Sequence, residues 1–197
     1  KLILGKPEYD FIIDDKAYNY DNDWMSKLNK GWIYLHNNFL KTFSLKNKIA
    51  VITGGCGMLG IQHAEAIAEI DGIPVLFDIK EDKKEIERIK KEYGTDCLFY
   101  QGDVTKENDI TNFLNELEKN GNNVDILINN AALNPDPALD NAKLKKSLNR
   151  FEEFEVKEWL KEINVGLTGA FLFSKIVGNK MATNKGGVII NISSDLG

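Results

Sequence analysis

The sequence is short of the residues that mark several classes of protein. It has two cysteines, Cys56 and Cys97, which are too few for a disulfide scaffold and fit a reducing compartment such as the cytoplasm. Its two histidines, His36 and His63, lie far apart and have no matching acids or cysteines, so we expect no metal site. No apolar run approaches the ~20 residues that span a bilayer, and the first residues do not resemble a signal peptide, so no membrane partner is expected.

Basic clusters are also missing. The 197 residues include 25 Lys and Arg against 30 Asp and Glu, and no basic cluster stands without interleaved acids. The net charge of −5 therefore gives no reason to expect nucleic acid as a partner. Hydrophobic residues make up 43% and charged residues 28% of the chain, which excludes disorder throughout and fits one domain with an appendage.

From about residue 48 onward, short apolar runs alternate with helical patterns. The runs indicate parallel strands buried on both faces, at 49–52, 74–77, 97–100, 126–128 and 188–192. The intervening patterns predict helices over 60–70, 81–93, 106–119 and 156–180. We expect an α/β fold, a Rossmann-like doubly wound parallel sheet in three α/β/α layers, formed by residues 45–197 and cut after its fifth strand. Residues 1–44 form an N-terminal extension or the remnant of a preceding domain.

Local signals at these helices lead to further expectations. Gly94 is a plausible stop for the second helix and Thr105 a plausible N-cap for the third. The stretch 133–155 is long for a connection in an α/β fold. Trp159 and the helically spaced apolar residues of the last helix are expected to pack in the core; they are Val156, Leu160, Ile163, Leu167, Phe171 and Ile176.

A glycine-rich turn follows the first predicted strand. Its sequence is Thr53-Gly54-Gly55-Cys56-Gly57-Met58-Leu59-Gly60, in which Gly55, Gly57 and Gly60 satisfy G-x-G-x-x-G. Such a turn lets the backbone approach a pyrophosphate closely at the start of a helix. A glycine turn without a ligand is the alternative, but the position between a buried strand and a helix favours dinucleotide binding. The small side chain of Cys56 suits this turn, and we do not interpret it as a nucleophile.

An acid stands where a ribose would need one. Asp78 ends the second predicted strand, about 18 residues after Gly60, the distance typical of an acid that binds the ribose hydroxyls. A carboxylate there would repel a 2′-phosphate, so NAD is favoured over NADP. The alternative is that Asp78 caps the helix predicted at residue 81, and the two interpretations can coexist.

In order, these motifs resemble those of the short-chain dehydrogenase/reductase family over residues 45–197. Thr53-Gly54-x-x-Gly57-x-x-Gly60 resembles the nucleotide loop, and Gly102-Asp103-Val104-Thr105 resembles the step that contacts adenine. Asn129-Asn130-Ala131-Ala132 resembles Asn-Asn-Ala-Gly, and Ile190-Asn191-Ile192-Ser193-Ser194-x-x-Gly197 resembles the strand before the active-site serine. The resemblance implies that the cofactor is contacted by Gly54, Gly55, Gly57, Met58, Leu59, Gly60, Asp78, Ile79, Asp103, Val104, Asn130, Ala131, Ala132 and Ile192.

The resemblance also implies a chemistry. Hydride would pass between nicotinamide and the carbonyl or alcohol carbon of a small molecule, with Ser194 donating a hydrogen bond to the substrate oxygen. The amino-acid sequence of these motifs is similar to that of oxidoreductases of surface-polysaccharide and flagellin-glycan biosynthesis. This similarity implies that a sugar or nucleotide-sugar is one candidate substrate. The family commonly forms homo-oligomers. A sugar-nucleotide epimerase or dehydratase with tightly bound NAD, and a non-catalytic dinucleotide-binding module, remain as alternatives.

Two family features are missing. No Tyr-x-x-x-Lys occurs in the chain, so we expect the 197-residue polypeptide to be an inactive fragment. Gly166 stands where the family usually has an Asn, seven residues after Trp159, and Asn164 lies about 200° away around a helix. Either the proton relay differs or the helix is irregular there.

The beginning of the chain carries a separate resemblance. Within residues 1–24, a strand-like run ends in Asp14-Asp15 and resembles the last motif of haloacid-dehalogenase-type phosphatases, where an acidic pair helps to bind Mg²⁺. An acidic turn capping a helix at residue 16 is the alternative.

Overall fold

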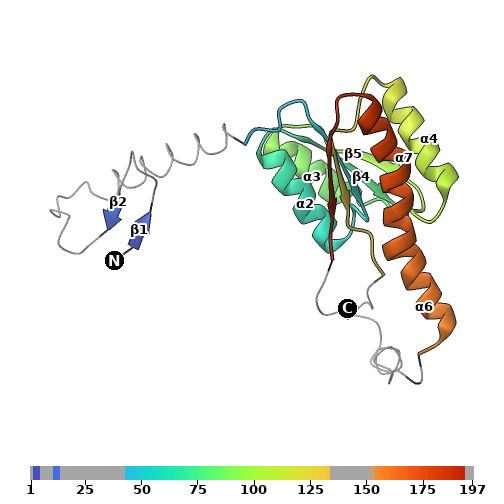
Figure 1. The fold of residues 1–197 in the computed structure, drawn as a ribbon. Coiled ribbons are helices and arrows are strands. Elements are labelled where there is room, and N and C mark those ends of the chain that lie inside the picture. Colours follow the sequence, from blue (N-terminus) through green and yellow to red (C-terminus); the bar gives the residue numbers. More distant parts are fainter. Residues whose placement is uncertain (1, 5–10, 14–42, 134–151, 153, 194–197) are drawn as a thin grey trace. The chain divides into compact units, whose positions relative to one another are not determined.

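The computed structural model describes residues 2–4, 11–13, 43–133, 152 and 154–193. The chain divides into two units, Lys1–Phe43 and Ser44–Gly197, which are considered separately. In the first unit, β1 (Leu2–Leu4) pairs antiparallel with β2 (Phe11–Ile13) (Figure 1). β2 coincides with the strand-like run noted above, whereas Asp14 and Asp15 lie outside the described residues, so the phosphatase-like motif stays a prediction.

The second unit is built on a five-stranded sheet. Its strands are β3 (Ile49–Thr53), β4 (Ile73–Asp78), β5 (Leu98–Gln101), β6 (Ile126–Asn129) and β7 (Val188–Asn191). They lie in the order β5-β4-β3-β6-β7, and every neighbouring pair is parallel (Figure 1). The order reverses at β3, which is the strand that leads into the glycine-rich turn. In open α/β sheets, such a switch point is where ligands bind.

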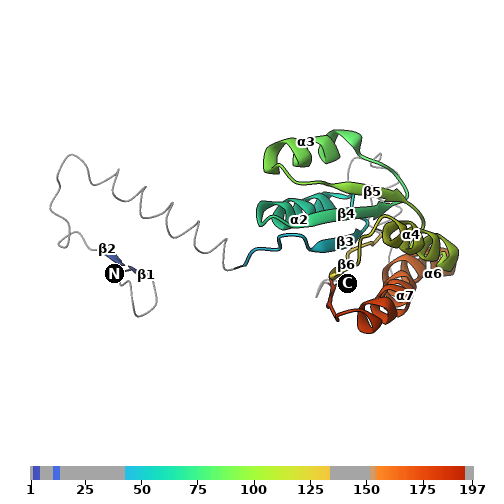
Figure 2. The same cartoon turned by 90° about the horizontal axis from the view of Figure 1, so that it is seen from above.

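Helices cover both faces of this sheet. They are α2 (Met58–Glu69), α3 (Lys83–Tyr93), α4 (Glu107–Lys119), α6 (Val156–Ile163) and α7 (Gly169–Thr183). Figure 2 shows α2 and α3 on one side of the strands and α4 and α7 on the other. The expected three-layer doubly wound fold is therefore confirmed. Among the described residues, no helix has the length and apolar character needed to cross a membrane.

Alternate residues of the strands build two core layers. Ile52, Leu76 and Ile128 pack beneath α2 and α3, whereas their neighbours in the strands face α4 and α7. On the second face, the buried ring of Phe77 meets the rings of Phe113 and Phe173 edge-on, with centroids 5.3 and 4.8 Å away. This aromatic cluster lies under the carboxyl end of β4, close to the residues that the sequence assigns to a ligand.

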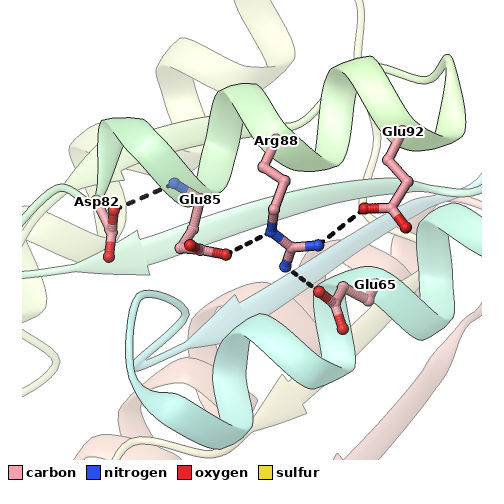
Figure 3. Close-up of polar contacts among 5 residues, drawn as sticks. All are labelled: Glu65, Asp82, Glu85, Arg88 and Glu92. Carbon is pink, nitrogen blue, oxygen red and sulfur yellow. Dashed lines mark hydrogen bonds and ion pairs between the residues drawn. The ribbon is translucent and has the colours of Figure 1, made fainter.

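The two helices on the first face are joined by an ion network (Figure 3). Arg88 of α3 donates through Nε to Glu85 at 2.7 Å, through Nη1 to Glu92 at 3.0 Å, and through Nη2 to Glu65 of α2. Hydrogen bonds from Arg88 to Glu65 and Glu85 raise the pKa of its guanidinium above the ordinary value. One guanidinium therefore holds α2, the helix after the glycine-rich turn, against α3.

Both ends of α3 follow from its sequence. The Oδ1 of Asp82 accepts a hydrogen bond from the backbone N–H of Glu85 at 3.2 Å, which caps the start of the helix. Gly94 ends the helix in the left-handed conformation, with φ of 67°, and its N–H donates to the carbonyl of Lys90. The predicted stop at Gly94 is confirmed.

The last predicted helix differs from expectation. A π-helical turn at Asn164–Thr168 interrupts the 156–180 pattern and separates α6 from α7. None of the residues of α6 is buried. The prediction of a core role was therefore wrong for several apolar residues, which are all more than half exposed: Val156 (71%), Trp159 (52%), Leu160 (52%), Leu167 (65%) and Phe171 (61%). The core is instead reached by Gly169, Phe173, Val177 and Met181 of α7. The helical spacing of apolar residues predicted one buried face for this region, but a different face of α7 packs against the sheet.

Candidate functional site

The glycine-rich turn connects β3 to α2 and is shaped by close packing. Gly54 adopts φ of +60°, and a Cβ there would lie 2.9 Å from the Cα of Ala131. A Cβ at Gly55 would lie 2.8 Å from Leu76, and one at Gly60 only 2.3 Å from the carbonyl oxygen of Gly54. These three positions exclude a side chain, whereas a Cβ at Gly57 would be 3.2 Å from the nearest atom. The backbone is thus bare and closely folded where a ligand would approach it.

The start of α2 is left open for an anion. Its N-cap residue, Gly57, makes no side-chain cap hydrogen bond, and the first turn contains no acid. In contrast, α3 is capped by Asp82, and α4 has Glu107 and Asp109 in its first turn. The first N–H groups of a helix lack intrahelical partners, and the dipole there favours negative charge. Among these three helices, α2 alone presents such an end without an acid of its own, at the residues Met58 and Leu59 assigned to the cofactor.

Asp78 lies beside the glycine-rich turn. Its Oδ2 accepts a hydrogen bond from the backbone N–H of Cys56 at 3.0 Å, and its Oδ1 accepts one from the N–H of Lys80 at 3.3 Å. Asp78 does not cap α3, because Asp82 does so. The alternative interpretation of Asp78 as a helix cap is therefore wrong. The next residue, Ile79, is 67% exposed and offers an apolar surface next to the carboxylate.

The thiol of Cys56 sits among these acids. Burial, together with the nearby charges of Asp78, Asp82 and Glu81, raises its pKa to about 11, although a hydrogen bond from the backbone of Asp82 acts in the opposite direction. The thiol is therefore protonated at neutral pH, which agrees with its interpretation as a small side chain and not as a nucleophile.

The turn between β5 and α4 holds the second acid, Asp103. Its Oδ1 accepts hydrogen bonds from the backbone N–H of Thr105 at 2.9 Å and from the Thr105 hydroxyl at 2.7 Å. Partial burial works to raise the pKa of Asp103, but the bonds from Thr105 and the charge of Lys106 outweigh it and lower the pKa. The predicted N-cap was wrong: the N-cap of α4 is Lys106, because the Thr105 hydroxyl donates to Asp103.

A glycine separates this turn from the aromatic core. A Cβ at Gly102 would lie 2.3 Å from Cζ of Phe77. The next position after Asp103 is Val104, which is only 7% exposed and belongs to the same core cluster. The backbone of the turn therefore rests directly on the core.

The end of β6 is fastened to the glycine-rich turn in both directions. The hydroxyl oxygen of Thr53, which is 2% exposed, accepts hydrogen bonds from the N–H groups of Asn130 at 3.0 Å and Ala131 at 3.1 Å. The amide of Asn130 donates to the carbonyls of Thr53 at 3.0 Å and Gly54 at 3.2 Å. These hydrogen bonds in both directions hold Ala131 and the exposed Ala132 beside the glycine-rich turn. Sequence reasoning had no signal for the role of Thr53.

Asn129 connects β6 to the strand that precedes the predicted catalytic serine. Its amide nitrogen donates to Oδ1 of Asn191 at 2.8 Å and to Oγ of Ser174 at 3.0 Å. Its carbonyl accepts from the N–H of Ile192 at 2.9 Å. Ile192 is 41% exposed, and Ser194 lies outside the described residues. The contribution of Ser174 on α7 was missed because only the fold brings it to β6.

The π-helical turn explains part of the departure at Gly166. The helix is irregular there, as one of the two alternatives held. Asn164 is exposed, and its Oδ1 accepts a hydrogen bond from the Thr168 hydroxyl at 3.4 Å. A Cβ at Gly166 would meet open space. Asn164 is thus engaged within its own turn and does not take the place of an Asn at position 166.

The described site residues share one edge of the sheet. Asp78 is the last residue of its strand, Gly54–Gly60, Asp103 and Asn130 follow the carboxyl ends of theirs, and the four strands are adjacent. Beside Asp103, a groove of about 610 Å³ opens between β5 and α4, with Ile79 and Gly102 in its lining. In the described part of the chain, no group of three or more His, Cys, Asp or Glu side chains could hold a metal ion. The arrangement places a helix start without an acid of its own after β3, two acids on the neighbouring strands β4 and β5, and the exposed apolar side chain of Ile79 between those acids in the sequence.

Comparison with known proteins gives a consistent result. The family model of the short chain dehydrogenases matches residues 48–197. The NAD-dependent glycerol dehydrogenase of Listeria innocua is 34% identical over 156 residues, which cover 79% of this chain and 56% of that protein. The sorbose reductase of Candida albicans is 30% identical over 163 residues, covering 81% of this chain and 54% of that protein. The chain spans about half the length of these curated relatives.

Solved structures share the fold. The structure of NAD⁺-bound xylitol dehydrogenase superposes with a TM-score of 0.63 at 23% identity, covering 76% of this chain and 54% of that one. The NADPH-dependent 3-quinuclidinone reductase of Rhodotorula rubra gives a TM-score of 0.60 at 25% identity, covering 76% and 53%. One of these structures is described with NAD⁺ and the other with NADPH, so the shared fold does not distinguish the two cofactors.

Proposed function

Since the chain belongs to the short-chain dehydrogenase/reductase family, we propose that residues 45–197 bind NAD and form the cofactor-binding part of an oxidoreductase acting on a small carbonyl or alcohol. Two neighbouring features carry this proposal. The start of α2 has no side-chain cap and no acid, and the Asp78 carboxylate accepts a hydrogen bond from the backbone N–H of Cys56, in the turn that leads into α2. A pyrophosphate fits the first feature and a ribose diol fits the second.

The residues present fit a dinucleotide. The absence of side chains at Gly54, Gly55 and Gly60 lets the turn fold closely against Ala131, Leu76 and its own backbone. A turn folded in this way would bring its backbone N–H groups to the pyrophosphate at the N-terminus of α2. Asp78 would accept hydrogen bonds from the adenosine ribose, and Asp103 and Ile79 would bound the adenine. Asn130 and Ala131 would border the cofactor from β6. When bound, the cofactor supplies the hydride chemistry.

The preference for NAD rests on charge. Asp78 already accepts two backbone hydrogen bonds, and a 2′-phosphate beside its carboxylate would place like charges together. A relative that uses NAD, the glycerol dehydrogenase of Listeria innocua, supports the same choice.

The substrate we propose is a small polyhydroxylated carbonyl or alcohol, a sugar or nucleotide-sugar among them. The names of two relatives, a glycerol dehydrogenase and a sorbose reductase, support this class. Ser194, two residues after Ile192, would donate a hydrogen bond to the substrate oxygen at the end of β7.

We also propose that the protein forms a homo-oligomer through α6 and α7. Four apolar side chains of this region, Val156, Leu160, Leu167 and Phe171, are each more than half exposed, as is Trp159. Exposed apolar surface of this kind is typical of protein–protein interfaces.

A titration tests the central proposal. Purified chain is titrated with NAD and with NADP by calorimetry, and we expect saturable binding of NAD that is about tenfold or more tighter than binding of NADP. Absence of saturable binding of either dinucleotide would refute the proposed function. Tighter binding of NADP would refute the assignment of the ribose to Asp78 while leaving the dinucleotide site in place.

A further inference from the structure

The first turn of α4 reaches back to the turn that precedes it. Asp109 lies in this first helical turn, and its Oδ2 accepts a hydrogen bond from the backbone N–H of Asp103 at 3.0 Å. The Lys106 N–H also donates to the Asp103 carbonyl at 3.0 Å. The peptide groups on both sides of Asp103 are therefore fixed by residues that follow it in the chain.

This arrangement determines how the Asp103 side chain is presented. Because its backbone is fixed, its Oδ1 can accept both hydrogen bonds from Thr105, the backbone one at 2.9 Å and the hydroxyl one at 2.7 Å. Its Oδ2 forms a longer ion pair with the ammonium of Lys106, at 3.7 Å. One carboxylate oxygen is thus engaged within the turn, and the other can accept a hydrogen bond from a ligand.

The same residues line one groove. Asp103, Lys106 and Asp109 border the groove of about 610 Å³ between β5 and α4, together with Ile79 and Gly102. Because the lowered pKa keeps Asp103 ionised at neutral pH, its Oδ2 can only accept hydrogen bonds. A ligand group beside it must therefore be a donor, such as an exocyclic amine on an aromatic ring lying against Ile79.

We propose that Asp109 is a positioning residue for the recognition of the adenine amino group, and that it acts through the backbone of Asp103 without touching the cofactor. The inference rests on the proposed function, since it requires adenine to lie beside Asp103. It adds to that function a determinant of base selectivity, carried by a side chain on α4.

A simpler role for Asp109 would be to stabilise the helix start. An acid in the first turn interacts favourably with the helix dipole wherever its carboxylate points. Glu107 lies in the same first turn of α4. Its Oε1, however, accepts a hydrogen bond from Lys175 of α7 at 2.9 Å and makes no hydrogen bond to the turn that carries Asp103. Glu107→Ala is therefore a matched control that removes an acid from the same helix start and leaves the bond to Asp103 intact.

The test compares two dinucleotides that differ at one group of the base. NAD carries the adenine amino group, whereas nicotinamide hypoxanthine dinucleotide has a carbonyl oxygen there. For the unsubstituted chain, we expect NAD to bind about tenfold tighter than the analogue, because the analogue faces the Asp103 carboxylate with an acceptor. In Asp109→Ala, this ratio is expected to fall to about 2 or less. Asp109→Asn keeps an acceptor oxygen and should retain most of the ratio, and Glu107→Ala should retain all of it.

A double substitution protects the test against misfolding. Asp103→Ala removes the carboxylate itself and should abolish the ratio, so that adding Asp109→Ala to it changes the ratio no further. A ratio in Asp109→Ala equal to that of the unsubstituted chain would overturn the inference while NAD binding upheld the proposed function. A further fall in the double variant would also overturn it, because Asp109 would then act independently of Asp103. If the unsubstituted chain bound neither dinucleotide, both proposals would fail.

Discussion

Asp78 and Cys56 hold each other in place across the glycine-rich turn. The carboxylate at the end of β4 accepts a hydrogen bond from the backbone N–H at the centre of the turn, at 3.0 Å. The acid proposed to bind the ribose is therefore also one of the groups that order the backbone proposed to bind the pyrophosphate. Substitutions at Asp78 act on both.

Asp78→Asn and Asp78→Ala separate these two contributions. Asn keeps an oxygen that can accept from Cys56 and loses the charge, so we expect NAD affinity to fall about tenfold and the preference over NADP to shrink. Ala loses both, and NAD affinity should fall further. Calorimetric titration with both dinucleotides measures the change. Unaltered NAD affinity and an unaltered NAD/NADP ratio in Asp78→Ala would show that this side chain does not bind the ribose.

Glycine substitutions should follow the packing around each position. Gly60→Ala places a Cβ 2.3 Å from the Gly54 carbonyl oxygen, so we expect loss of NAD binding and destabilisation by about 2 kcal/mol. Gly57→Ala, with 3.2 Å to the nearest atom, should be milder. Gly166→Ala meets open space and serves as the control, with unchanged affinity. Thermal unfolding and NAD titration check all three, and equal effects at positions 60 and 166 would contradict the geometry.

The ion network around Arg88 should contribute to stability in a salt-dependent way. Arg88→Met keeps much of the side-chain length but removes the donors to Glu65, Glu85 and Glu92, leaving three carboxylates near one another. We expect a melting temperature lower by a few degrees, and a smaller difference at high salt, because the side chain is partly exposed and such pairs are screened. Lys90→Met, which loses one exposed pair with Glu87, is the control. No difference between the two variants would argue against a network.

Both thiols should react slowly with alkylating agents in the folded chain. Burial is the main cause that raises the pKa of Cys56 to about 11 and that of Cys97 to about 12. At pH 8 we expect Cys56 to react with iodoacetamide roughly a hundredfold more slowly than in the unfolded chain, with Cys97 slower still. Mass spectrometry of the labelled peptides measures both rates. Fast labelling of Cys56 would mean that its thiolate is accessible.

The same shifts set a pH dependence of stability. The folded chain holds these thiols protonated above the ordinary thiol pKa of 9.0. Their contribution to stability is fully present below pH 9 and is lost as the pH rises towards about 11 for Cys56 and about 12 for Cys97. Denaturant unfolding of a Cys56→Ser variant should show a weaker decline over the alkaline range, whereas an identical decline would assign it to other groups.

Turnover is expected to need residues that this chain does not contain. None of its six tyrosines is followed four positions later by a lysine. We therefore expect the 197-residue chain to bind NAD without reducing it in the presence of polyols, as followed by absorbance of the reduced nicotinamide. Measurable reduction would mean that another group transfers the proton.

The sheet, both layers of helices and the glycine-rich turn were predictable because their signals are local. A parallel strand is a short apolar run, and the stop at Gly94 depends on one residue that tolerates a left-handed backbone. The prediction that all five runs are buried on both faces was wrong for β7, whose four residues are exposed at the edge of the described sheet. The place of Asp78 at the end of β4 was predictable because the apolar run ends there, whereas its role at a ribose stays a prediction. These features are specified by residues close together in the sequence.

Features that depend on distant partners were not predictable. Thr105 has a side chain typical of an N-cap, but its hydroxyl donates a hydrogen bond to Asp103, and the N-cap of α4 is Lys106. The exposed stripe containing Leu160 and Phe171 has the same helical period as a core stripe, so only its position relative to the sheet distinguishes the two. The hydrogen bond from the amide of Asn129 in β6 to the hydroxyl of Ser174 joins residues 45 apart in the sequence.

Gly102 lies directly against the ring of Phe77, so a single peptide layer separates the aromatic cluster from the turn that carries Asp103. A change in the size of the side chain at position 77 should therefore shift the backbone of the turn directly, and with it the proposed recognition of the base. In diverging lineages, positions 77 and 102 should covary, and directed-evolution libraries that repack Phe77 or Phe173 should alter base selectivity even though neither ring touches solvent.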